Sequence, residues 1–372
     1  MTLFELLIAG STLLAGTALL LPSLSRAREA ARDTVSLSNL RQLSMASMTY
    51  STEFRDRLPA FNWTDRLGAS RYDDLERQRA RGGAASRAAQ AVDLLRRRAG
   101  REDIPPIEGW LPDPLYTPVL LSEYLTARLP ENIVVSPRDA LLGDWQDDPR
   151  GSFDRGGWGD RQPEPTPGAK RWPYSSSYEF VPAGWDAAQT LATRPGFERT
   201  PVRQGRRHDV YLVSDSLDLP APQVSMAMFP ASKVQIVESI GTGRSGLFGT
   251  GTTRRFFTSP GVRSPQAFFD GHARIIEASG VNPGWDPHKP SGAAPTLFAA
   301  GVDPWHFAED PDLMPETVAG RQRWTRGGLR GIDVDAPEIA TGQPGAWDGR
   351  TEGWQGVVME AERRDGTTPV DW

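Results

Sequence analysis

The chain has 372 residues and a formal net charge of −5 at neutral pH. This acidic balance, without a dominant basic stripe, argues against nucleic acid as a partner. The chain contains no cysteine, which excludes disulfides, and its 32 prolines and 37 glycines predict unusually plentiful loops around a modest core.

An apolar run, MTLFELLIAGSTLLAGTALLLP, opens the chain over residues 1–22, and Glu5 is its only charged side chain. From Leu3 to Leu21 the run spans about 29 Å of helix at roughly 1.5 Å per residue, enough to cross a bilayer. An ionised Glu in hydrocarbon costs on the order of a few kcal/mol and needs a partner. The nearest positive charge is the amino terminus, at Met1 or in a neighbouring copy. A neighbouring copy would make this segment an assembly device.

Two simpler interpretations of the run are a secretory signal peptide and a plain single-pass anchor. A signal peptide predicts basic residues before the apolar run and a small-residue cleavage site after it. Glu5 stands where the basic residues would be, and the run continues into LPSLSRAREAARD without such a site. A plain anchor leaves Glu5 without an explanation.

The helical pattern continues beyond Pro22, because apolar and small residues recur every three to four residues, or at small multiples of that spacing, to about residue 55. Pro22 is therefore expected to kink one long helix rather than end it, since its ring removes one backbone hydrogen bond and crowds the preceding turn. Residues 1–55 are predicted to form a helix that inserts into a membrane with its first half and is amphipathic in its second.

Residues 56–372 are predicted to form an extracytoplasmic head, which makes the fold class α+β: a long kinked helix packed on an antiparallel sheet with long loops. The expected order is a helical part at about 66–130, a loop at 140–173, a sheet at about 174–280 and a loop-rich extension at 281–372. The Arg-rich stretch 77–103 is interpreted as a solvated helix with an apolar face at Ala88, Ala91, Val92 and Leu95.

The sheet is predicted from strand-like stretches at 209–217, 223–229 and 233–240 and from two arms that flank Asp270 and Gly271. Asp-Gly between AFF and HARII indicates a type I′ hairpin turn, in which both central residues take positive φ.

Catalytic patterns are sparse, so the sequence does not predict an enzyme. The histidines, His208, His272, His288 and His306, are far apart and show no zinc spacing. The Gly-rich stretch 241–255 lacks the Lys-Ser/Thr ending of a phosphate loop and reads as a strand connection.

Calcium is the one metal considered, and no other cofactor is predicted. An Asp-rich stretch offers hard oxygen ligands on a Gly-bearing loop, namely Asp144, Asp147, Asp148, Asp154 and Asp160. Its spacing is not that of an EF-hand, and the interleaved arginines offer another way to neutralise the carboxylates. The twelve tryptophans, many in predicted loops, suggest either a glycan- or protein-binding surface or anchors that pack loops on the sheet.

The N-terminal region resembles a known family. TLFELL at 2–7, Pro22 and SLSRAREAARDTVSLSNLRQLSMASMTY at 23–50 resemble type IV pilin-like proteins, and most closely the large planctomycete-type pseudopilins with a prepilin cleavage and methylation segment. In that family a short basic leader is removed and the new amino terminus is methylated. A Glu four residues further on pairs with the terminus of an adjacent subunit. The resemblance gives Met1 the first position, where Phe is usual, Glu5 the assembly role and Pro22 the kink.

Two segments downstream carry weaker similarity to the same family. LLSEYLTARLPENIVVSPRD at 120–139 resembles a segment in which Cys is frequent where Ser136 stands, and Ser36 likewise stands at a frequent Cys position. QAFFDGHARII at 266–276 resembles the Asp-Gly hairpin of the family, with Pro260 in the place of its signature His.

The resemblance implies a structural subunit that assembles through its N-terminal helix into a type II secretion pseudopilus or a type IV pilus-like filament. Its implied location is the inner membrane, crossed once, with the head in the periplasm or outside the cell. Its implied partners are other copies or related pilin-like subunits, the membrane and, given a leader upstream of Met1, prepilin peptidase. The alternative is a monomeric single-pass surface protein whose Trp-rich head binds a glycan or a protein.

Overall fold

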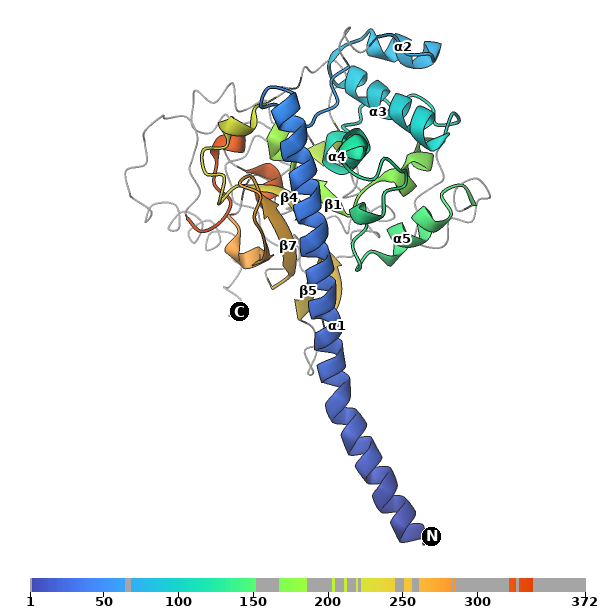
Figure 1. The fold of residues 1–372 in the computed structure, drawn as a ribbon, viewed down its shortest axis with the longest axis vertical. Helices are drawn as coiled ribbons and strands as arrows, with labels where there is room; N and C mark the ends of the chain where they lie inside the picture. The colour runs from blue at the N-terminus through green and yellow to red at the C-terminus, as the bar shows by residue number, and fades with distance from the viewer. Residues whose placement is uncertain are drawn as a thin grey trace, which may run out of the picture.

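A long N-terminal helix, a helical layer and an antiparallel sheet make up the computed structural model (Figure 1). The α+β class, the long helix and the antiparallel sheet predicted from the sequence are confirmed. The structure describes residues 2–63, 68–151, 167–185, 203–204, 211–212, 219, 222–244, 251–255, 261–282, 284, 321–325 and 328–336. Within these, the side chains of residues 5–7, 9–10, 13–20, 203–204, 212, 242–244 and 251–255 are outside the description.

Helix α1 runs from Leu3 to Glu53 without interruption. Pro22 lies inside it and does not end it, and Figure 1 shows one continuous ribbon that bends below the head. The C-terminal half lies across the sheet, where it packs against β4, β7 and β8. The helix ends where Arg55 and Asp56 adopt positive φ values of 57° and 67°, which an α-helix cannot continue.

The helical layer beside the sheet contains α2 (Asp73–Arg79), α3 (Gly83–Ala99), α4 (Asp113–Leu120) and the short 3₁₀ turns η2 (Leu121–Tyr124) and η3 (Asn132–Val134). The interpretation of 77–103 as a solvated helix is wrong, because most of α3 is buried on all sides. Two of its buried arginines form ion pairs: Arg87 pairs with Asp113 at 3.0 Å and Arg96 pairs with Asp74 at 2.6 Å.

The predicted loop 140–173 contains two ordered elements, α5 (Ala140–Asp147) and the 3₁₀ helix η4 (Pro167–Tyr174). Two buried tryptophans join them, since the rings of Trp145 and Trp172 lie 5.7 Å apart. Asp139 caps α5 by accepting a hydrogen bond from the Leu142 amide at 3.2 Å. Aromatic burial and this cap explain why a stretch rich in Gly and Pro is locally regular.

The main sheet has six strands in the order β1-β4-β7-β5-β6, and β8 pairs with β7. Its strands are β1 (Tyr178–Phe180), β4 (Val234–Glu238), β5 (Ile240–Arg244), β6 (Gly251–Arg255), β7 (Arg263–Phe268) and β8 (Ala273–Glu277). Strands β2 (Arg203–Gln204) and β3 (Tyr211–Leu212) form a separate antiparallel pair. Register places Val237 opposite Gln266 and Gln266 opposite Arg274.

The strand predicted at 223–229 is wrong, because the 3₁₀ turn η6 (Val224–Met226) occupies it. Asp56 at the end of α1 accepts hydrogen bonds from both the amide and the hydroxyl of Ser225. Such a side-chain bond to the backbone competes with strand pairing.

Asp270 and Gly271 lie in the turn between β7 and β8. The Gly271 amide donates to the Phe268 carbonyl at 2.9 Å, and the Phe268 amide donates to the His272 carbonyl at 2.9 Å. These hydrogen bonds close a loop of three residues, 269–271. Only Gly271 has a positive φ in it, 88°, whereas a type I′ turn needs two such residues, so the predicted turn type is wrong. A Cβ at position 271 would lie 2.8 Å from Met48 Cε, the movable end of a flexible side chain, so it is the positive φ that favours glycine here.

The two faces of the sheet are covered by segments from opposite ends of the chain. Tyr178, Ile236 and Ala267 pack with Leu40 and Leu43 of α1 on one face. On the other face, the expected loop-rich extension supplies η11 (Arg321–Trp324), η12 (Gly328–Arg330) and residues up to 336. Two buried ion pairs bind this segment to the strands, Arg323–Glu179 at 2.7 Å and Lys233–Asp333 at 2.9 Å.

Candidate functional site

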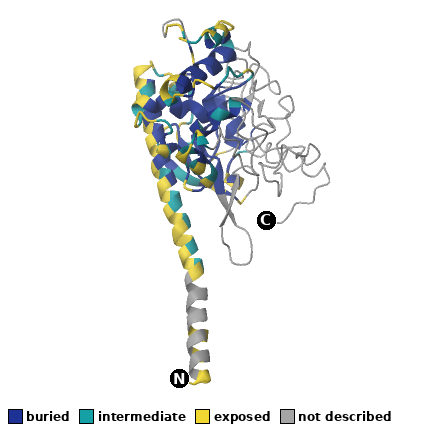
Figure 2. Cartoon of the chain, turned by 90° about the vertical axis from the view of Figure 1, so that its right-hand side faces the viewer, coloured by how far each residue is buried: buried dark blue, intermediate teal, exposed yellow. Residues whose placement is uncertain are grey.

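The N-terminal half of α1 projects beyond the head (Figure 2). Large apolar side chains on it are exposed to solvent, with exposed fractions of 83% for Leu3, 73% for Phe4 and 68% for Leu24. Ile8 and Leu21 are exposed as well. A helix with exposed apolar residues along its length is characteristic of a surface that meets a partner or a lipid phase.

Glu5, one of the two residues assigned to assembly, lies near the N-terminal end of this projection. Met1 lies outside the described residues, and Glu5 lies within α1, with its side chain outside the part that the structure describes. Most side chains of the apolar run are likewise outside it. Within the described part of the chain, no helix combines the length and the apolar character needed to cross a bilayer.

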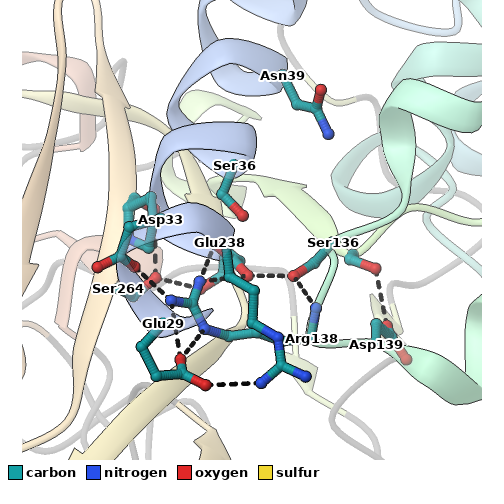
Figure 3. Close-up of polar contacts among 12 residues, drawn as sticks. Glu29, Asp33, Ser36, Asn39, Ser136, Arg138, Asp139, Glu238 and Ser264 are labelled. Carbon is teal, nitrogen blue, oxygen red and sulfur yellow. Dashed lines mark hydrogen bonds and ion pairs between the residues drawn. The ribbon is translucent and has the colours of Figure 1, made fainter. Parts of the chain in front are cut away.

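A cluster of charged and hydroxyl side chains, here termed the polar clamp, joins α1 to the head where the projecting half ends. It consists of Glu29, Asp33 and Ser36 from α1, Ser136 and Arg138 from the loop before α5, and Glu238 from β4 (Figure 3).

The Arg138 guanidinium lies at the centre of the polar clamp and is 1% exposed. It contacts the Glu29 carboxylate at 3.4 Å and the Glu238 carboxyl at 3.4 Å, and it donates a hydrogen bond to Asp33. Arg32 pairs with Glu29 from within the helix at 2.6 Å. One guanidinium is thereby shared by carboxyl groups from two different elements.

Local hydrogen bonds hold the Arg138 loop in place. The Ser136 hydroxyl accepts the Arg138 amide at 3.0 Å, a short turn typical of serine. The Ser177 hydroxyl of the residue before β1 donates to Asp139 at 2.8 Å, and this ties the loop to the sheet. Ser136 also donates to the Glu238 carboxyl, so the loop and β4 meet at the polar clamp.

Burial dominates the electrostatics of the polar clamp. It raises the pKa of Glu238 to about 7, against the opposing influence of the Arg138 cation and of hydrogen bonds to Ser136 and Ser36. Burial also works to lower the pKa of Arg138, but Glu238, Asp33 and Glu29 outweigh it and hold that pKa above its usual value. Arg138 is therefore always charged, whereas Glu238 titrates near neutral pH.

Hydrogen bonds between uncharged side chains continue the contact between α1 and the sheet from the polar clamp toward the C-terminal end of the helix. The Tyr178 hydroxyl accepts from Asn39 at 3.1 Å and donates to Ser36 at 3.3 Å. Gln235 accepts from Ser44 at 3.3 Å and donates to Ser47 at 2.9 Å. Satisfied buried networks of this kind specify one arrangement of the packed elements.

Ser36 and Ser136, the two positions where the resembled family often carries Cys, both take part in this contact: Ser136 donates to the Glu238 carboxyl, and Ser36 accepts from the Tyr178 hydroxyl. Sequence reasoning identified these serines only as departures from a pattern. It did not identify Glu238, Arg138 or Asn39, whose polar roles depend on partners distant in the chain. The one available signal was the run of small polar residues on the face of α1 that also carries Leu40 and Leu43.

The calcium candidates do not form a cluster in the described residues. Asp144 and Asp147 lie on α5, and Asp148 follows it and accepts the Gly151 amide at 2.7 Å. Asp154 and Asp160 lie outside the described residues. Across the described ranges, no three His, Asp or Glu side chains are placed to hold one metal ion.

All six described tryptophans are buried: Trp63, Trp110, Trp145, Trp172, Trp185 and Trp324. Their rings pack in the head instead of forming an exposed aromatic surface. Of the histidines, only His272 is described. It pairs with Asp270 at 2.5 Å and stacks on the Phe268 ring at 4.2 Å, so the hairpin turn accounts for it.

The site is thus a projecting apolar half-helix whose base is fixed to an α+β head by the polar clamp. One face of the sheet in the head packs against the C-terminal half of the same helix. No protein-family model, curated protein or solved structure matches this chain.

Proposed function

We propose that this protein is a structural, pilin-like subunit that assembles through the projecting half of α1 into a type II secretion pseudopilus or a type IV pilus-like filament. The observation that carries the proposal is the exposure of Leu3, Phe4, Ile8, Leu21 and Leu24 on a helix that extends past its own head. Apolar surface of this kind is stabilised by removal from water, either in a bilayer or against the same helix of other copies.

Glu5 supplies the specificity in this proposal. Its carboxylate lies in an apolar run with no basic side chain, so in a membrane or a helix bundle it requires a positive partner. The amino terminus of an adjacent copy fulfils that requirement, neutralises both charges and sets the axial offset between neighbouring helices. The polar clamp fixes the direction in which the helix leaves the head.

Cysteine cross-linking in membranes tests this proposal, because the native chain has no cysteine and a single one can be introduced at the exposed Ser11. Ser11→Cys is expected to give dimers with a flexible bis-maleimide cross-linker, whose reach covers the axial offset of about 6 Å that four residues of helix place between neighbouring copies. Adding Glu5→Ala is expected to leave the protein in the membrane fraction but to remove the cross-link. Glu102→Ala, at an exposed carboxylate on the head, is the matched control and should cross-link like the parent.

Undiminished cross-linking of the Glu5→Ala variant would refute the role of Glu5. Absence of any Ser11→Cys cross-link in the parent would instead support the alternative, a monomeric single-pass surface protein whose head binds a glycan or a protein.

A further inference from the structure

The polar clamp contains three carboxyl groups and one cation, and a second cation lies beside it. Glu29 and Asp33 come from α1 and Glu238 comes from β4, and Arg138 contacts all three. Arg32 adds a second positive charge, on Glu29 alone. With all three carboxyls ionised the cluster has an excess negative charge, and a single proton balances it.

Burial determines which carboxyl holds that proton. The side chain of Glu238 is 0% exposed, whereas those of Glu29 and Asp33 are each 24% exposed and in reach of water. The Arg138 nitrogen nearest to Glu238 lies 3.4 Å from both carboxyl oxygens, longer than the 2.7–2.9 Å of a strong charge-assisted bond. Arg138 instead makes its close contact with Asp33 on the helix. The geometry is that of a neutral Glu238.

We propose that the polar clamp is a proton-controlled latch: the stretch of α1 from Glu29 to Asn39 stays docked on the head while the Glu238 carboxyl is protonated, and it loosens when that proton is lost. An ionised, fully buried Glu238 is costly without a close cation. Turning Arg138 toward Glu238 supplies one, at the expense of the contacts with Glu29 and Asp33. Water then solvates those two carboxylates, so the helix loses its ion pairs to the head at this point.

The direction of the pH effect follows from the burial that α1 provides. Burial raises the pKa of Glu238 to about 7, above the usual value of a Glu, and release of the helix removes part of that burial. A group with a raised pKa in the docked state favours docking at low pH, and this contribution is lost as the pH rises through about 7. The latch therefore opens toward alkaline pH, and it does so whether or not the protein assembles.

The other groups that face Glu238 do not titrate in this range. Tyr178 on β1 has a pKa raised by burial and stays neutral, and Ser36, Ser136 and Ser264 carry no charge. Arg138 stays charged. Asp113, paired with Arg87 in the helical layer, is a second buried carboxyl with a raised pKa, so the test must separate the two.

Amide hydrogen exchange on the full chain in a non-ionic detergent tests the latch. The opening equilibrium of residues 29–38, relative to that of residues 43–51 in the same molecule, is expected to rise about tenfold from about pH 6 to about pH 8, after correction for intrinsic exchange rates. Glu238→Gln, which is neutral at every pH, is expected to abolish this rise. Asp113→Asn is the matched control and is expected to preserve it.

A flat ratio in the wild-type protein would overturn the proposal without any variant, so the test holds even if Glu238→Gln folds poorly. The same rise in Glu238→Gln as in wild type, or its loss in Asp113→Asn, would equally overturn it, because the titrating group would then lie elsewhere.

Discussion

The two halves of α1 are one continuous helix in opposite surroundings. Residues 3–24 carry most of the apolar side chains and project away from the head, with Leu24 68% exposed. Residues 36–51 lie against the sheet, where Leu40 and Leu43 are fully buried but are flanked by Ser36, Asn39, Ser44 and Ser47. The more apolar half of the helix is the half that its own head leaves uncovered.

This contrast separates two tasks that one helix performs. The apolar half is suited to a non-specific environment, such as lipid or other helices, in which burial of surface is the stabilising effect. The polar half is suited to one partner only, because each buried hydroxyl or amide is costly unless its hydrogen bond is made. Docking of α1 on the sheet is thus specific, and it gives the projecting half a defined direction.

The largest expected difference between the two halves comes from the same substitution made in each. Leu43→Ala should lower the free energy of unfolding by about 2–5 kcal/mol, because it leaves a cavity between α1 and the sheet. Leu24→Ala, on the exposed half, should change it by less than about 0.5 kcal/mol. Urea unfolding followed by tryptophan fluorescence measures both, since the described tryptophans lie in the head. Equal losses would contradict the division of the helix into docked and projecting halves.

Removal of the central cation of the polar clamp is the next largest effect. Arg138→Ala should lower the free energy of unfolding by about 3 kcal/mol, near the lower end for a broken buried ion pair, because Glu238 can take up a proton. Arg128→Ala, at an exposed arginine in the preceding turn, serves as the control and should stay within about 0.5 kcal/mol of wild type. The loss should be smaller at pH 5, where Glu238 carries its proton, than at pH 8, where it is ionised.

Elements with a strong local pattern could be predicted from the sequence. The three-to-four-residue spacing of apolar side chains predicted α1, and the short apolar stretch at 233–240 predicted β4. Strand-like arms around Asp-Gly indicated the β7–β8 hairpin but not its turn type, because Gly271 has a positive φ and Asp270 does not.

Features that depend on distant partners could not be predicted in this way. Arg87 reads as a solvated charge in the sequence, and it is buried because Asp113, 26 residues away, neutralises it. The polar clamp is a stronger case, since Arg138 lies 109 residues from Glu29 and 100 residues from Glu238. No spacing rule relates positions so far apart.

A moderate effect is expected from the neutral network above the polar clamp. Tyr178→Phe removes the hydroxyl that accepts from Asn39 and donates to Ser36, and it leaves the buried Asn39 amide unsatisfied. The free energy of unfolding should fall by about 1 kcal/mol, as is typical for one buried hydrogen-bonding group. Tyr124→Phe removes a hydroxyl bonded to the exposed Glu53 and should cost less. A larger loss from Tyr124→Phe would show that the head holds α1 chiefly at the C-terminal end of the helix, near Glu53.

The smallest effect is expected at Glu29, the first residue of α1 that contacts the head in the polar clamp. Glu29→Gln removes a half-buried ion pair, and it should lower the free energy of unfolding by only about 0.5 kcal/mol. Its informative consequence is local: amide protection at residues 26–32 should fall, while residues 40–51 remain as protected as in wild type. This outcome follows because Asp33 keeps Arg138 on the helix one turn further along. The border between the projecting and docked halves would then move by about one turn, and loss of protection across the whole helix would instead show that the two halves undock together.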